Sequence, residues 1–272
     1  MKLGFSPFTN RLTPLDDAYR LAVDLNLDFI ELAWDVMELD ARTQPAREVV
    51  SLSRVTGVAC TIHLPFVDLN LASLMPGVAE NSVTRVQRAL DYAARVDARV
   101  GVLHTGFVPT RLPILLAAGR ERLVESLSRL PSVVPIALEN LALGYEDLLR
   151  GPEELVGVTT AAGVGFFNTL DFGHAVMEGS VTDALEGRSA GGLSAGHARL
   201  KDYVSGLGRV AHLHLHDNDG SADQHLPIGR GSINFLAHAG FLAAFPGTAC
   251  LEIAGDGNAV RESVTALRAL LG

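Results

Sequence analysis

Short runs of apolar residues recur along the chain, and longer amphipathic segments separate them. Each run is apolar at consecutive positions and rich in β-branched or aromatic residues, which predicts a strand buried on both faces. Eight runs fit this description: 3–8, 29–33, 58–63, 100–104, 134–140, 165–171, 210–215 and 249–253.

The intervening segments carry apolar residues three and four positions apart, which predicts helices, as in 15–25, 82–96, 114–130 and 260–271. Strands that are apolar on both faces and alternate with helices indicate parallel βαβ units. Eight such units favour a closed barrel over an open sheet. We therefore predict an α/β fold of the (β/α)8 TIM barrel class.

Length and composition agree with one such barrel. The chain has 272 residues, 48% of them hydrophobic, and α/β barrels commonly reach this length as one domain. No low-complexity linker separates two halves, so we expect a single domain over 1–272. The segment 186–196, rich in Gly, Ser and Ala, is interpreted as a loop on the rim or an interrupted sixth helix.

Charge, cysteine content and hydropathy narrow the class of protein. The chain has 31 acidic and 22 basic residues and a formal charge of -9, which argues against a general attraction to nucleic acid, although carboxylates gathered around bound cations inflate this count. Cys60 and Cys250 lie within predicted strands and are interpreted as core thiols. Because no secretion signal or membrane-spanning run is visible, we expect a cytoplasmic protein without a membrane partner.

Metal-ligating residue types gather where the predicted strands end. They are His63, His104, Glu139, Asp171, His174, His214, Asp223, His225 and Glu252. The carboxyl ends of barrel strands meet on one rim, which is where such folds keep their chemistry. Taken singly, each is equally well explained as a rim histidine bonded to a carbonyl or a carboxylate in a salt bridge. Six strand ends with such residues would bring like charges together, which favours a divalent-metal site.

Three local patterns sharpen this hypothesis. In 171–174, Asp-Phe-Gly-His, the carboxylate and the imidazole lie three apart across a turn, with the glycine easing the backbone. In 212–216 three histidines alternate along one strand face, so they cannot all bind one ion. The segment 223–225, Asp-Gln-His, adds one further carboxylate and imidazole. Mixed nitrogen and oxygen donors suit zinc, manganese, cobalt or iron, and argue against calcium or magnesium alone.

The ordered motifs resemble the xylose isomerase-like TIM barrel superfamily over nearly the whole chain. This superfamily joins sugar isomerases and epimerases to endonuclease IV, the nuclease of abasic sites in DNA. The motifs that carry the resemblance are 62–66 (Ile-His-Leu-Pro-Phe), 70–73 (Asn-Leu-Ala-Ser), 103–106 (Leu-His-Thr-Gly), 138–140 (Leu-Glu-Asn), 170–174 (Leu-Asp-Phe-Gly-His), 214–217 (His-Leu-His-Asp), 223–231 (Asp-Gln-His to Gly-Arg-Gly) and 251–252 (Leu-Glu).

The resemblance implies two ways of using the same residues. In the three-metal arrangement of the nuclease, one ion is held by His63, His104 and Glu139, a second by Glu139, Asp171, His214 and Glu252, and a third by His174, Asp223 and His225. In the epimerase branch, Glu139, Asp171, His214 and Glu252 bind a single ion, commonly manganese or cobalt, and the other imidazoles line the pocket. His214 is preferred over His216 because the family pattern His-Leu-x-Asp ends at Asp217.

Departures from the nuclease pattern favour the epimerase branch, although all nine nuclease ligand positions are present. The nuclease resembles Asp-Thr-Cys-His where 171–174 reads Asp-Phe-Gly-His, and it has a glutamate where Arg230 stands. Its tyrosine after the first His-x-Pro is Phe66 here. The expected function is a divalent-metal-dependent sugar or sugar-phosphate isomerase or epimerase that works through an enediolate, with Glu139 and Glu252 as catalytic acid and base.

Two alternatives remain beside this expectation. One is an abasic-site endonuclease with three zinc ions, the only case in which nucleic acid would be a partner. The other is a barrel that binds metal or sugar without turnover, which is least favoured because both candidate acid/base carboxylates are present. Under the preferred hypothesis one to three ions of zinc, manganese or cobalt serve as cofactor, and Trp34, Phe66, His216 and Arg230 line the substrate pocket. For Trp34, stacking on a sugar face and simple packing at the rim are equally favoured.

Overall fold

The computed structural model describes residues 1–7, 9, 14–39, 45–108, 110, 112–142, 148–149, 151–177 and 192–272. In these residues eight parallel strands close into a barrel in sequence order, with β8 beside β1. The strands are β1 Lys2–Phe5, β2 Phe29–Ala33, β3 Ala59–His63, β4 Gly101–His104, β5 Ile136–Glu139, β6 Phe166–Asp171, β7 Val210–Leu215 and β8 Thr248–Leu251. The predicted (β/α)8 barrel is confirmed.

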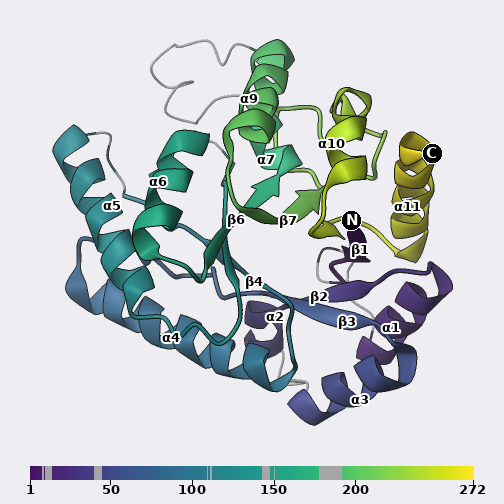
Figure 1. Cartoon of the computed structure of the whole chain (residues 1–272), viewed down its shortest axis with the longest axis horizontal. Coiled ribbons are helices and arrows are strands. Elements are labelled where there is room, and N and C mark those ends of the chain that lie inside the picture. Colours follow the sequence, from purple (N-terminus) through teal and green to yellow (C-terminus); the bar gives the residue numbers. More distant parts are fainter. Residues whose placement is uncertain are drawn as a thin grey trace.

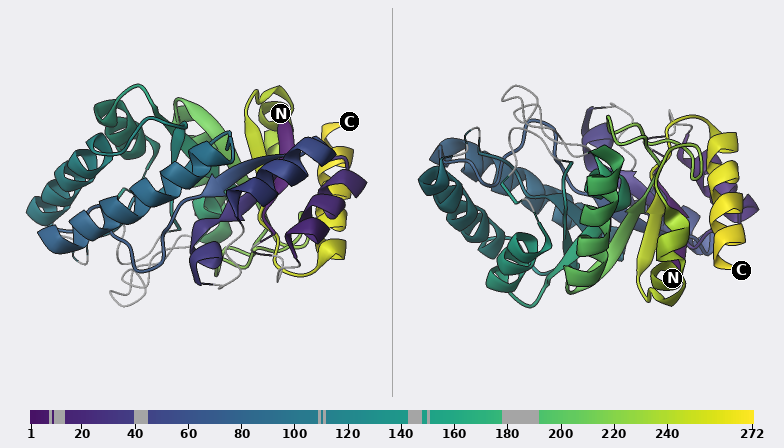
Figure 2. Two further views of the ribbon diagram at one scale, coloured as in Figure 1. Left: turned by 90° about the horizontal axis from the view of Figure 1, so that it is seen from below. Right: turned by 90° about the horizontal axis from the view of Figure 1, so that it is seen from above.

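Helices surround this ring of strands on the outside (Figures 1 and 2). They are α1 Leu15–Asp24, α2 Trp34–Leu39, α3 Ala46–Thr56, α4 Pro76–Arg95, α5 Pro113–Ser128, α6 Pro152–Ala162, α7 Phe172–Val176, α9 Gly192–Gly206, the 3-10 helix η1 Phe235–His238, α10 Ala239–Ala244 and α11 Gly257–Leu271. The first and last helices, α1 and α11, lie side by side where the barrel closes, and Arg268 of α11 donates a hydrogen bond to the carbonyl of Leu25. None of the described helices is both long enough and apolar enough to cross a membrane.

Proline and aspartate residues explain where several helices begin. Pro76, Pro113 and Pro152 start α4, α5 and α6, a position where the missing N–H would have no partner in any case. Asp256 caps α11 by accepting hydrogen bonds from the backbone of Asn258 and Ala259. The helix predicted over 82–96 therefore begins earlier, at the proline, and the one predicted over 260–271 begins just after its capping aspartate.

All eight predicted strands are present, most of them shortened by a residue or more at their ends. The strand predicted over 3–8 ends at Phe5, shortly before Pro7, which has no N–H to donate to a ladder. β8 ends at Leu251, so Glu252 is the first residue beyond its strand. Of the segment 186–196, residues 192–196 form the start of α9, and 186–191 lie outside the described residues. Cys60 and Cys250 are buried and unpaired, as expected for core thiols.

Candidate metal centre

The parallel register places the proposed ligands side by side at the carboxyl ends of the strands. His104 of β4 pairs with Glu139 of β5, and Asp171 of β6 pairs with His214 of β7. Since paired residues on neighbouring strands point to the same face, these side chains converge inside the rim. The strand register alone therefore explains why these four side chains lie close together.

The innermost group joins three carboxylates around one imidazole. Glu139, Asp171, His214 and Glu252 each offer a donor atom, and these atoms lie within 4.8 Å of one another. Nδ1 of His214 lies 2.8 Å from Oε1 of Glu139 and 3.3 Å from Oε2 of Glu252. The predicted second ligand set thus forms one compact, buried cluster.

A second group shares Glu139 with two histidines from β3 and β4. Nε2 of His63 lies 3.5 Å from Oε2 of Glu139, and Nε2 of His104 lies 3.2 Å from the same oxygen. The donor atoms of these three residues also lie within 4.8 Å of one another. This group matches the first ligand set that the family resemblance implied.

The third group lies toward the outside of the pocket and is centred on Asp223. Its Oδ2 atom lies 3.3 Å from Nε2 of His174 and 3.2 Å from Nε2 of His225. His216 joins this group, because its Nε2 atom lies 3.3 Å from Oδ1 of Asp171 and 3.5 Å from Oδ1 of Asp223. Whereas the sequence placed His216 in the pocket wall, the structure places it among the donors, fully buried and stacked on His225.

One glycine and one aspartate position the segments that carry these outer donors. A Cβ atom at Gly173 would lie 1.9 Å from the His216 ring, so glycine is needed there for close packing and not, as expected, for backbone freedom. Asp217 accepts hydrogen bonds from the backbone of Asn218, Gly229 and Ile233. This carboxylate thereby fixes the long loop that contains Asp223.

Glu31, in the middle of β2, is a site residue that the sequence analysis missed. Its Oε1 atom lies 3.0 Å from Nε2 of His214, and its Oε2 atom accepts a hydrogen bond from Thr61 at 2.8 Å. Oε2 also lies 3.2 Å from Nε2 of His212. The available signal was a charged residue inside the otherwise apolar run Phe-Ile-Glu-Leu-Ala, since an unpaired carboxylate is costly to bury.

The second ring nitrogen of several histidines is anchored, which fixes the ring orientation. Nδ1 of His63 donates to the carbonyl of Leu64, Nδ1 of His174 to that of Asn140, and Nδ1 of His225 to that of Glu252, at 3.0, 3.0 and 2.8 Å. Because carbonyls only accept, Nδ1 of each ring carries the proton and Nε2 faces the cluster. This is the arrangement that metal-binding histidines use.

The electrostatics of the cluster favour cations. Burial would raise the pKa of Glu139, but His214, His104 and His63 outweigh it and hold the pKa well below its usual range. Burial would likewise lower the pKa of His214, but Glu252, Glu139 and Glu31 raise it well above its usual value. The Glu139 carboxylate is thus ionised, and a proton on His214 balances part of the negative charge. A divalent cation would supply the same positive charge and displace such protons.

Two buried carboxylate oxygens test whether the donors fit a metal ion. Oε2 of Glu139 and Oδ2 of Asp171 are buried and receive no aligned hydrogen bond, although histidine nitrogens lie 3.2 and 3.8 Å from them. Both ring nitrogens of His216 likewise lack an aligned hydrogen bond. Buried polar atoms in native proteins are rarely left in this state unless an ion or water completes them. The donor set is mixed nitrogen and oxygen, as in zinc, manganese and cobalt sites. The residues therefore fit a divalent transition-metal ion.

The cavity above the cluster has a volume of about 170 Å³. Its wall includes Ser6, Thr9, Ala33, Phe66 and seven of the nine proposed ligands. The Phe66 ring lies against His63 and His104, with centroids 4.9 and 4.8 Å away. Phe66, which the sequence analysis expected in the pocket wall, therefore does line this cavity.

Trp34 and Arg230, also expected in the pocket wall, lie elsewhere. Trp34 begins α2 and packs edge-on against Tyr92 of α4, on a separate cavity outside the barrel. Arg230 is exposed and forms an ion pair with Glu262 of α11. Strand position placed both residues near the rim, but the packing partners turn their side chains away from the metal cluster.

Comparison with known proteins decides the family. Residues 19–270 match the family described as xylose isomerase-like TIM barrel. The chain belongs to this family. A family relative from Methanocaldococcus jannaschii, named as an uncharacterized protein, is 31% identical over 250 residues, which cover 87% of this chain and 77% of the relative. A probable endonuclease 4 from Mycobacterium tuberculosis is 28% identical over 199 residues, 70% of this chain and 71% of its own length.

Similar solved structures cover the entire barrel. A D-tagatose 3-epimerase-like protein has a TM-score of 0.78 at 24% identity, covering 100% of this chain and 97% of its own, a likeness that shows the fold alone. A Thermus thermophilus protein soaked with ZnCl2 has a TM-score of 0.70 at 26% identity, covering 99% of this chain and 96% of its own. The similar proteins are mostly enzymes, among them sugar epimerases and endonuclease 4 relatives.

Proposed function

We propose that this protein is a divalent-metal-dependent sugar or sugar-phosphate isomerase or epimerase. The observation that carries the proposal is the convergence of two carboxylates, Glu139 from β5 and Glu252 after β8, on Nδ1 of His214 at 2.8 and 3.3 Å. An epimerisation needs one group that removes a carbon-bound proton and one that returns it. Two carboxylates at the ends of different strands of one pocket can do this from different sides of a substrate.

Each residue of the cluster has a role in this scheme. Glu139, Asp171, His214 and Glu252 would hold the ion, which would supply the positive charge that stabilises an enediolate. Glu139 and Glu252 would also move the proton to and from carbon. His63, His104 and Phe66 line the pocket on the β3 and β4 side, where they would position the sugar and exclude water.

The abasic-site endonuclease is the second candidate, and one observation favours it. The two donor groups implied for the first and second ions of the nuclease are assembled, and Asp223 lies beside His174 and His225 of the third. A nuclease would use clustered ions to generate a hydroxide and to clamp a phosphate. Against it, the formal charge is -9, and phosphate tracks are typically basic. Binding without turnover is the least favoured function, since both candidate acid/base carboxylates are present in the cluster.

The deciding experiment combines metal analysis with two activity assays. Purified protein would be analysed for zinc, manganese and cobalt, then assayed on a panel of ketoses and sugar phosphates and on DNA with a single abasic site. Epimerisation with one ion per chain supports the proposal. Incision of the DNA with about three zinc ions, the count that the multi-metal scheme requires, would replace it with the nuclease.

A further inference from the structure

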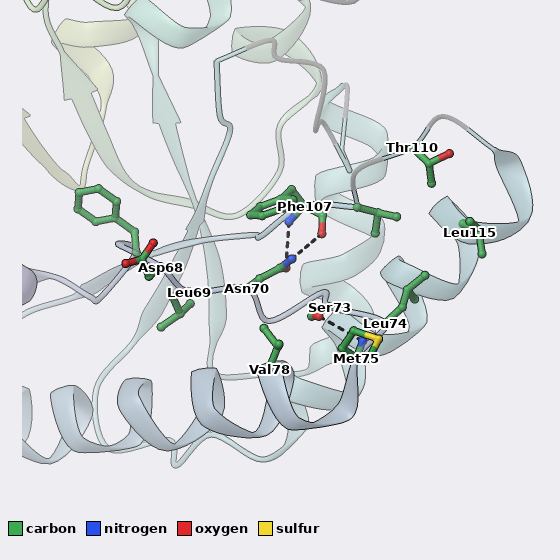
Figure 3. Close-up of a pocket in the computed structure, with 12 residues that line it drawn as sticks. Asp68, Leu69, Asn70, Ser73, Leu74, Met75, Val78, Phe107, Thr110 and Leu115 are labelled. Carbon is green, nitrogen blue, oxygen red and sulfur yellow. Dashed lines mark hydrogen bonds between the residues drawn. The ribbon is translucent and has the colours of Figure 1, made fainter.

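A second, larger cavity adjoins the candidate metal centre and differs from it in chemistry. Its volume is about 660 Å³, against about 170 Å³ for the cavity above the cluster. It lies between the loops that follow β3 and β4 and the first turns of α4 and α5 (Figure 3). Phe66 lines both cavities, so its side chain lies at the boundary between them.

The wall of this larger cavity is mostly apolar. Leu69, Leu74, Met75, Val78, Phe107, Val108 and Leu115 contribute to it beside Phe66. Its polar side chains are Asp68, Asn70, Ser73 and Thr110. Asp68 is exposed, and Thr110 accepts a hydrogen bond from the backbone of Leu112. Asn70 donates to the carbonyl of Phe107 and accepts from the backbone of Phe107 and Ala72, and Ser73 accepts from the backbone of Met75. Among the described wall residues, the two buried polar side chains, Asn70 and Ser73, are thus both hydrogen-bonded within the protein.

Exposed apolar side chains gather around the same cavity. Among the described residues, six of the eleven exposed large hydrophobic side chains belong to 67–78 or 112–114, next to or within its wall. Met75 and Val78, at 67% and 46% exposed, line the cavity directly. A concentration of exposed apolar surface beside a hollow marks a binding site more often than it marks plain surface.

The size of the two cavities points to a substrate that spans both. Ordinary small-molecule sites have volumes of roughly 300–1,000 Å³, so the space above the cluster alone is small for a complete site. The larger cavity falls within that range. If the polar head of a ligand lies at the metal cluster, the apolar wall of the larger cavity lies next to it, on the other side of Phe66.

We infer that the substrate is a sugar or sugar derivative bearing an apolar substituent, with the sugar at the metal cluster and the substituent in the larger cavity. This inference rests on the proposed function for the identity of the head group. The occupant of the apolar half is defined by the wall itself. It is an alkyl or aryl group that requires no hydrogen bonds.

The test is a binding series with one head group and increasing chain length, read out by calorimetry on the purified protein. Methyl, butyl and hexyl β-D-glucopyranoside serve as probes. Affinity should rise about threefold to fourfold for each added methylene that enters the cavity, so hexyl should bind about tenfold more tightly than butyl. Equal affinity of butyl and hexyl, or no measurable hexyl binding, would overturn the inference, since the apolar contribution does not depend on the sugar chosen.

Surface substitutions locate the effect without threatening the fold. Met75→Gln and Val78→Gln place polar groups in the wall and should remove most of the gain from butyl to hexyl. Val55→Gln is the matched control, because Val55 is 83% exposed and does not line this cavity. Loss of the gain in Val55→Gln as well would contradict the assignment. A dimer that Met75→Gln dissociates, with no chain-length effect, would identify this surface as an interface between copies instead.

The same series separates failure of this inference from failure of the proposed function. Glu139→Gln, which removes a proposed acid/base group, should keep the chain-length effect. If the effect is present but wild-type protein epimerises no sugar, the apolar subsite stands and the reaction must be reassigned. If free sugars are epimerised and chain length has no effect, the reaction stands and the apolar substituent is excluded.

Discussion

Nε2 of His214 lies 3.0 Å from Oε1 of the buried Glu31, while Nδ1 of the same ring faces Glu139 and Glu252. One carboxylate thus holds the imidazole from the barrel interior and leaves its other nitrogen to the metal cluster. Carboxylates in this position fix the tautomer of a ligating histidine and make it a better donor. Glu31 is therefore a positioning residue for the candidate centre.

Glu31→Gln should weaken metal binding by roughly 10- to 100-fold, since a neutral amide no longer polarises the ring. The measurement is a competition titration against a chelator with Mn²⁺ and Zn²⁺. Thr61→Val is the matched control, because Thr61 donates to the other oxygen of Glu31 and its loss leaves the charge in place. That variant should lose about 1 kcal/mol of stability and keep its metal affinity. Equal weakening in both variants would mean that the network acts through packing.

Glu139→Gln and Glu252→Gln should each lower kcat at least about 100-fold, the usual contribution of a positioned acid or base. The assay is epimerisation of whichever sugar the panel identifies, at saturating substrate. Metal content of each variant must be measured alongside, since both carboxylates also belong to the ligand set. His197→Gln and His238→Gln, which lie outside the pocket wall, should retain activity. Full activity in either variant of the two glutamates would remove the acid/base assignment.

The sequence could predict that residues at the strand ends lie close together, and the physical reason is simple. Parallel strands of a closed barrel end on the same rim, so residues at the ends of separate apolar runs must come together, as His104 and Glu139 do in register. Glu31 lies in the middle of β2, so the rule that rim residues follow strand ends does not predict it. Trp34 and Arg230 were placed by sequence position, but the directions of their side chains depend on partners in α4 and α11 that no local pattern reveals.

Metal counting separates the inner group from the outer one. With a single ion held by the inner group, wild-type protein should contain one ion per chain, and Asp223→Asn should leave that number unchanged. Asp223 is exposed, so its substitution should not disturb the core. Elemental analysis of protein loaded and then freed of excess metal gives the count. A decrease by one ion in the Asp223→Asn variant would indicate that His174, His216 and His225 help to hold a further ion.

Cys60 and Cys250 should not react with a thiol reagent such as Ellman's reagent in the native protein at pH 8. Both are buried. Burial, with a smaller contribution from Asp97, raises the pKa of Cys60 to about 12. Burial and the negative charges of Glu31 and Glu252 raise the pKa of Cys250 well above its usual value. Since the thiolate is the reacting form, both groups are protected by pKa as well as by access.

Unfolding in guanidinium chloride should expose both thiols, so the reagent should then titrate two groups per chain, which is the internal control.

Cys250 also lies within 4.8 Å of donor atoms of Glu31 and His212. Nδ1 of His212 already lies 2.6 Å from Oγ1 of Thr248, and its Nε2 atom lies 3.2 Å from Oε2 of Glu31. Glu31 is also engaged by Thr61 and His214. Cys250→Ser should therefore leave the metal content unchanged. Rapid reaction of one thiol in the native state, or loss of an ion in this variant, would show that the thiol faces an accessible or metal-binding environment.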